Sequence, residues 1–99
     1  MDFKELQKEV YQNKINKGFN VTDLNMEFCC AYGELGEAYS AWLKKKDDLG
    51  EELADVVIFL MGISEILGLD LGEEIKHKIE KNKTRVYKNI DGVPYRIKG

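Results

Sequence analysis

Residues 49–67 read LGEELADVVIFLMGISEIL and decide the fold. At about 100° per residue, steps of four and three place one apolar seam along a helix: Leu49, Leu53, Val56, Leu60, Ile63 and Leu67. Further apolar side chains occupy much of the remaining circumference: Val57, Ile58, Phe59, Met61 and Ile66. A helix that is apolar nearly all round is covered on more than one side. Because 99 residues cannot supply that cover, we expect a partner chain to complete it.

The composition predicts a single small domain over residues 1–99. Hydrophobic residues make up 43% of the chain and charged residues 33%, which is typical of a globular protein. The net charge of -3 disfavours a nucleic-acid duplex as partner. The longest apolar run is too short to span a bilayer, so no membrane partner is expected. The start of the chain lacks the order of a signal peptide, and the adjacent Cys29 and Cys30 form neither a disulfide framework nor a zinc site, which suits a cytoplasmic protein.

Capping residues and glycines predict three further helices. The first runs from after Asp2 to near Gly18, and the second from Thr22 or Asp23 to about Lys46. A final helix is expected over residues 71–87, followed by a turn and an extended segment. The predicted fold class is therefore all-α: a helical bundle of about four helices, joined by short loops and completed by oligomerisation.

The second predicted helix carries two different stripes. Its apolar stripe predicts a core seam: Leu24, Phe28, Ala31, Leu35, Ala38 and Trp42. A stripe of smaller residues contains Glu34 and Glu37, which stand on adjacent turns and are close enough to share one ligand.

A second acidic pair, Glu52 and Asp55, projects from the otherwise apolar third helix. The short connection at residues 44–48 makes the two helices antiparallel neighbours, so the two pairs would face each other. Converging carboxylates repel one another, and a hard divalent cation such as Mg²⁺ relieves that repulsion. The alternative is that both pairs are solvated helix surface, as a single pair of this kind usually is.

The last predicted helix supplies the opposite charge. One of its faces carries residues suited to a phosphate chain: Lys78, Lys81, Asn82 and Arg85. The alternative is a solvated basic helix end, which complements the helix dipole. His77 is expected at the surface. In the tail, Tyr95 and Arg96 could close over a site, including that of a neighbouring subunit.

Three segments resemble a known family. GELGEA at 33–38 and EELADVV at 51–57 resemble the paired acidic signature of the MazG-like nucleoside triphosphate pyrophosphohydrolases, which belong to the all-alpha NTP pyrophosphatase superfamily. KIEKNKTR at 78–85 resembles the basic segment that follows in that family. The similarity covers roughly residues 24–87, in the family's order. One departure is Gly33, which stands where the family commonly has a further Glu and so leaves the general base and the number of metal ions open.

The resemblance implies Mg²⁺-dependent hydrolysis of (deoxy)nucleoside triphosphates to monophosphate and pyrophosphate, with Mn²⁺ as a substitute metal. It implies a homodimer or homotetramer that serves nucleotide-pool housekeeping. By position, the catalytic and metal-binding residues are Glu34, Glu37, Glu52 and Asp55. By position also, the residues that bind the phosphate chain are Lys78, Lys81, Asn82 and Arg85.

Two other functions are compatible with the sequence. One is a phosphoribosyl-ATP pyrophosphohydrolase, which shares the general architecture. The other is a non-enzymatic helical interaction module whose acidic clusters are only solvated. The chain has neither a Gly-x-x-x-x-Gly-Lys phosphate loop nor a partner for His77 that would form a nucleophilic site, so phosphoryl chemistry here would depend on carboxylates and cations.

Overall fold

The computed structural model describes residues 2–98 and is mostly helical, as predicted. Four helices precede a small antiparallel hairpin: α1 Phe3–Lys17, α2 Leu24–Leu43, α3 Leu49–Ile66, α4 Leu71–Lys83, β1 Val86–Ile90 and β2 Val93–Lys98. No helix within residues 2–98 has the length and apolar character needed to cross a bilayer.

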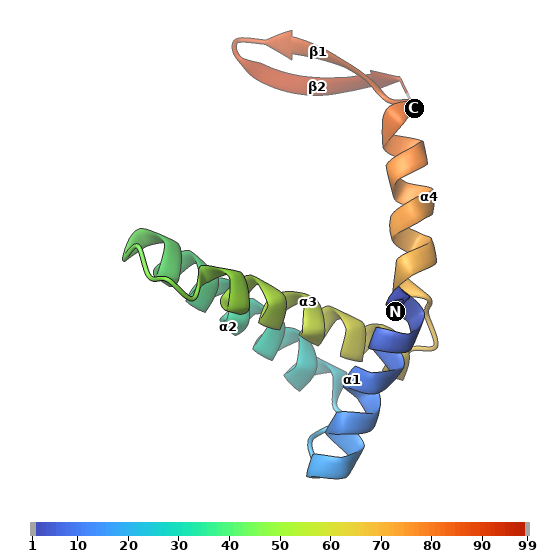
Figure 1. Ribbon diagram of the computed structural model, residues 1–99. Coiled ribbons are helices and arrows are strands. Elements are labelled where there is room, and N and C mark those ends of the chain that lie inside the picture. Colours follow the sequence, from blue (N-terminus) through green and yellow to red (C-terminus); the bar gives the residue numbers. More distant parts are fainter. Residues whose placement is uncertain (1, 99) are drawn as a thin grey trace.

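Helices α2 and α3 lie side by side as an antiparallel pair, and α1 packs across one end of α3 (Figure 1). Ala38 and Ala41 are the buried apolar residues of α2, and their small side chains allow α3 to approach closely. Helix α4 contacts α1 and then leads away from the α2–α3 pair, with the hairpin at its far end (Figure 1). The molecule therefore consists of the α2–α3 pair with α1 packed on it, and of α4 and the hairpin, which project from this unit.

Aspartate side chains cap three of the four helices. The Asp23 carboxylate accepts a hydrogen bond from the Met26 amide, and Asp2 and Asp70 cap α1 and α4 in the same way. The predicted end of α2 at Lys46 is wrong, because the chain leaves the helix after Leu43 and Lys45 adopts a φ of 56°.

The predicted end of α4 at Tyr87 is also wrong, because α4 ends at Lys83 and residues from Val86 onward form a strand. Valine and tyrosine favour the extended conformation. The predicted turn lies at Asp91 and Gly92, whose φ values of 53° and 79° are those of a type I′ hairpin turn. The register pairs Ile90 with Val93 and Tyr87 with Arg96.

A buried glutamine fixes the point from which α4 departs. The Gln7 amide donates hydrogen bonds to Glu65 Oε1 at 3.0 Å and to the Leu69 carbonyl at 2.7 Å. Its side-chain oxygen accepts from the Leu71 amide at 3.2 Å. One side chain of α1 thus holds the end of α3 and the start of α4 together.

The core of the single chain is thin. Only a few apolar residues among 2–98 are buried: Ala38, Ala41, Met61 and Ile63. The predicted core seam of α2 is wrong for its largest members, since Phe28, Leu35 and Trp42 are 47%, 54% and 60% exposed. Helical periodicity places them correctly on one face, but nothing within residues 2–98 covers their side chains fully.

The size of the molecule agrees with this incomplete cover. Its accessible surface is 7595 Å², whereas a compact monomer of 11.4 kDa exposes about 5,800 Å². Its radius of gyration is 16.6 Å, against about 13 Å for a compact chain of this length. The single chain therefore exposes about 1,800 Å² more than its mass requires.

One ion pair is buried at the corner between α1 and α2. The Lys14 ammonium contacts Glu27 Oε1, and their side chains are only 11% and 4% exposed. Asn20 donates a hydrogen bond to the other oxygen of Glu27 at 3.1 Å. The Lys14 ammonium also lies 5.3 Å from the centre of the Phe59 ring, a cation–π distance. The pair thus connects α1, α2 and α3.

Candidate metal centre

Three of the four predicted carboxylates meet between α2 and α3. Glu34 and Glu37 stand one turn apart on α2, and Glu52 stands in the first turn of α3. One oxygen from each of these three residues lies within 4.8 Å of the others. The antiparallel pairing brings them together, because the last half of α2 lies beside the first half of α3.

Asp55 lies outside this group of three. It follows Glu52 by three residues on α3, and its side chain is exposed. Its charge nevertheless raises the pKa of both Glu34 and Glu52. The structure therefore places Asp55 at the edge of the acidic cluster, which we define as Glu34, Glu37, Glu52 and Asp55.

Loss of solvation and mutual repulsion disfavour the state in which every carboxylate of the acidic cluster is ionised. Partial burial raises the pKa of Glu34, and the charges of Glu37, Asp55 and Glu52 raise it further. Loss of solvation also raises the pKa of Glu52, assisted by the charges of Asp48 and Glu37. Glu52 Oε2 is buried and has no hydrogen-bond partner among the described residues. An unpartnered carboxylate oxygen beside two other carboxylates is an unfavourable arrangement without a cation.

The donor set fits a hard divalent cation. All of its donors are carboxylate oxygens, the ligand type that Mg²⁺ and Mn²⁺ prefer. None of the ion pairs found within residues 2–98 involves a member of the acidic cluster. Glu34, Glu37 and Glu52 are therefore the residues that could hold a metal, with Asp55 beside them.

We expect the metal-free protein to lose stability as the pH rises above about 4.3, the ordinary pKa of Glu. Below that pH, Glu34 and Glu52 are protonated in both the folded and the unfolded state. As the pH rises, the unfolded chain releases these protons first, because the pKa of both groups is raised in the folded state. The free energy of unfolding therefore falls until the pH exceeds the folded-state pKa values.

Thermal unfolding with and without Mg²⁺ measures this effect. Mg²⁺ at ten times its Kd should add about 1.4 kcal/mol to the free energy of unfolding, and this gain should increase with pH because the ligands must be ionised. The Glu52→Gln variant should show a smaller pH dependence and a smaller Mg²⁺ effect. An unchanged Mg²⁺ effect in this variant would contradict the assignment of Glu52 as a ligand.

The predicted small residues beside the cluster leave open space. Apart from the local backbone of α2 and the two neighbouring residues, no atom lies within 4 Å of where a Cβ would stand on Gly33. Cys30, one turn before Glu34, is an exposed free thiol. The face of α2 beside the carboxylates is thus uncrowded and accessible to a ligand.

Basic residues gather at the far end of α4. The pKa of Lys78 is lowered by loss of solvation and then by the charges of Arg85, Lys81 and Arg96. Arg85 lies between α4 and β1, and its buried Nε has no hydrogen-bond partner among the described residues. Asn82 lies in the last turn of α4, and its backbone carbonyl accepts a hydrogen bond from the Arg85 amide at 3.2 Å.

Arg96 joins this group through the hairpin, which pairs it with Tyr87 beside Arg85. The sequence indicated Arg96 as a tail residue that could close over a site, whereas its place near Arg85 depends on the strand register. We define the basic cluster as Lys78, Lys81, Arg85 and Arg96.

The two clusters do not form one site within a single chain. Helix α4 packs on α1 and carries the basic cluster away from the α2–α3 pair (Figure 1). The expectation that basic residues stand opposite the carboxylates is therefore not met within one copy of the chain. The helical spacing of each cluster can be read from the sequence. The direction in which α4 leaves the α2–α3 pair cannot be read from it.

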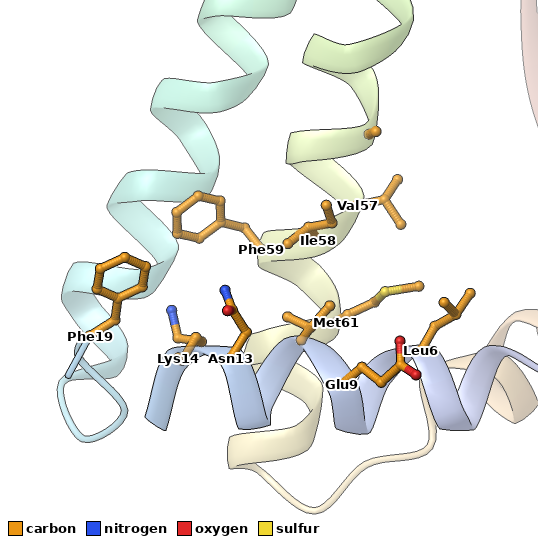
Figure 2. A pocket seen from close by; sticks show the side chains of 11 residues that line it. Leu6, Glu9, Asn13, Lys14, Phe19, Val57, Ile58, Phe59 and Met61 are labelled. Carbon is orange, nitrogen blue, oxygen red and sulfur yellow. The ribbon is translucent and has the colours of Figure 1, made fainter. Parts of the chain in front are cut away.

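A separate cavity lies between α1 and α3. It has a volume of about 680 Å³, and Figure 2 shows Leu6, Glu9, Asn13 and Lys14 of α1 facing α3 across it. The α3 side is apolar, and Phe19 closes one end. No member of the acidic cluster lines this cavity, so it provides no support for the metal centre.

Comparison of the chain with protein-family models, with curated proteins and with solved structures found no match.

Proposed function

We propose that the protein is a divalent-cation-dependent hydrolase that converts (deoxy)nucleoside triphosphates to monophosphates and pyrophosphate. The observation that carries the proposal is the meeting of Glu34, Glu37 and Glu52 within 4.8 Å on two adjacent helices. The resemblance of residues 24–87 to MazG-like pyrophosphohydrolases agrees with it. The basic cluster adds the positive charge that a triphosphate requires.

The reaction adds water to the α-phosphorus, while the bond from this phosphorus to the oxygen bridging to the β-phosphorus breaks. Glu34, Glu37 and Glu52 would hold a Mg²⁺ ion, which would supply charge neutralisation and polarise phosphate oxygens. The ionised form of Glu34 or Glu52 can accept the proton that the water loses. Once brought to the acidic cluster, Lys78, Lys81 and Arg85 would stabilise the negative charge on the departing pyrophosphate.

Pyrophosphate release across a panel of nucleotides tests the proposal. The panel contains dUTP, dCTP, the other deoxynucleotides, the ribonucleotides and phosphoribosyl-ATP, each measured with Mg²⁺ and with excess chelator. We expect Mg²⁺-dependent release from at least one nucleoside triphosphate. Selective release from phosphoribosyl-ATP would assign the other hydrolase activity. A non-enzymatic module would hydrolyse none of them, and Mg²⁺ would not change its thermal stability.

Replacing Arg85 with Ala should raise the KM for the triphosphate by about 10-fold to 100-fold and affect kcat less. The expected size is that of one hydrogen bond to a charged group, about 1.5–3 kcal/mol. Lys83→Ala is the matched control, because Lys83 lies two residues before Arg85 and pairs with Glu80 on an exposed face of α4. Steady-state kinetics checks both variants. An unaltered KM for Arg85→Ala would show that Arg85 does not bind the triphosphate.

A further inference from the structure

Residues 71–98, which we call the arm, differ in charge from the rest of the chain. The arm holds eight Lys and Arg against four Asp and Glu, a formal charge of +4. Residues 1–70, which we call the body, hold seven against fourteen, a formal charge of -7. Opposite charges of this size attract two molecules and orient their approach. Within one chain this attraction is unused, because the arm leads away from the α2–α3 pair (Figure 1).

The arm also exposes apolar side chains that a lone helix and hairpin cannot bury. On α4, Ile75 and Ile79 are exposed, and the exposed apolar residues of the hairpin include Tyr87, Tyr95 and Ile97. A two-stranded hairpin is marginally stable on its own in water. The arm therefore has the composition of a segment that packs against another surface.

The chain as a whole exposes enough surface for such an interface. The single chain exposes about 1,800 Å² more than a compact monomer of its mass, and a standard interface buries about 800 Å² per partner. On α2 and α3 the exposed apolar residues include Leu35, Trp42 and Leu53. Apolar surface and negative charge on the body thus match apolar surface and positive charge on the arm.

We infer that the arm of one copy docks on the α2–α3 pair of a second copy and brings its basic cluster to that copy's acidic cluster. Arg85 Nε and Glu52 Oε2 are the two buried side-chain atoms without partners among the described residues, and they belong to the two surfaces that docking would join. A two-fold arrangement lets each copy give one arm and receive one. The phosphate-binding role of the arm rests on the proposed function, whereas the docking rests on charge and exposed surface alone.

Carbodiimide cross-linking of isotopically mixed protein tests the docking without any activity measurement. Unlabelled and ¹⁵N-labelled full-length chains are unfolded together, refolded, and treated with the reagent, which joins lysine amines to carboxylates. We expect cross-links from Lys78 or Lys81 to the acidic cluster, about half of them joining a labelled to an unlabelled chain. Lys76–Glu73 and Lys83–Glu80 lie within one helix, so their cross-links should never be of mixed isotope. Arm-to-body cross-links of a single isotope only, or none at all, would overturn the inference.

Complementation between two defective variants tests the shared site. One partner carries Glu52→Gln, and the other carries Lys78→Ala, Lys81→Ala and Arg85→Ala. In a refolded equimolar mixture, half of the dimers are mixed and each of these has one intact site if the clusters meet between copies. Activity should therefore return to about a quarter of the wild-type value. Clusters that meet within one copy would give no recovery. If the wild type hydrolyses no nucleotide, the proposed function fails while the cross-links still decide the docking.

Discussion

The Glu52→Gln variant is expected to release pyrophosphate about 10²-fold to 10³-fold more slowly than the wild type. Glu52 contributes one of the three converging carboxylate oxygens. Its Oε2 has no hydrogen-bond partner among the described residues. The substitution keeps the shape of the side chain and removes the charge, and losing one group that stabilises transition-state charge costs about this much. Asp55→Asn should act in the same direction with a smaller effect, because Asp55 lies at the edge of the cluster.

Single-turnover pyrophosphate release under saturating Mg²⁺ measures the loss. Glu51→Gln is the matched control, since Glu51 is adjacent on α3, is exposed, and lies outside the cluster. This control should retain wild-type turnover, and all three variants should keep the wild-type helical content and elution volume. Near-normal turnover by both Glu52→Gln and Asp55→Asn would remove the proposed site.

The Glu27→Gln variant should lower the free energy of unfolding by about 3–5 kcal/mol, because it leaves a buried cation without its partner. The Lys14 ammonium contacts Glu27 and the Phe59 ring, and Asn20 donates a hydrogen bond to the other oxygen of Glu27. The amide of glutamine cannot neutralise the ammonium. Urea denaturation followed by circular dichroism at a fixed protein concentration measures the change.

Two further variants identify the cause of that loss. Glu80→Gln breaks an ion pair whose side chains are 72% and 66% exposed, so it should change stability by about 0.5 kcal/mol or less. The double substitution of Lys14→Met with Glu27→Leu removes both charges and should recover much of the lost stability. A Glu27→Gln protein as stable as Glu80→Gln would show that the corner is held by packing rather than by charge.

The helices could be predicted from the sequence because their signals are local. Aspartates at positions 2, 23 and 70 cap the helix starts, and the apolar period of residues 49–67 identifies α3. The strand pairing of the hairpin escaped prediction, because Val86 and Tyr87 continue the helical pattern of α4 and only pairing across Asp91 and Gly92 reveals the strand.

The acidic cluster could also be predicted from the sequence. Each of two antiparallel neighbouring helices carries a pair of carboxylates three residues apart, and this geometry makes the pairs converge. The position of the basic cluster could not be predicted in this way. It depends on the direction in which α4 leaves the body, and this direction is set by the buried Gln7 through hydrogen bonds that span about sixty residues of sequence. No local pattern marks a glutamine in the middle of α1 as buried.

The uncovered face of α2 contains its own optical reporter. Trp42 is the only tryptophan of the chain, and its indole is 60% exposed and stacked on Tyr39 with 6.1 Å between ring centres. Indole emission moves to shorter wavelength when water is withdrawn from the ring. A dilution series read at that wavelength therefore follows the covering of this face in the unlabelled, unmodified protein.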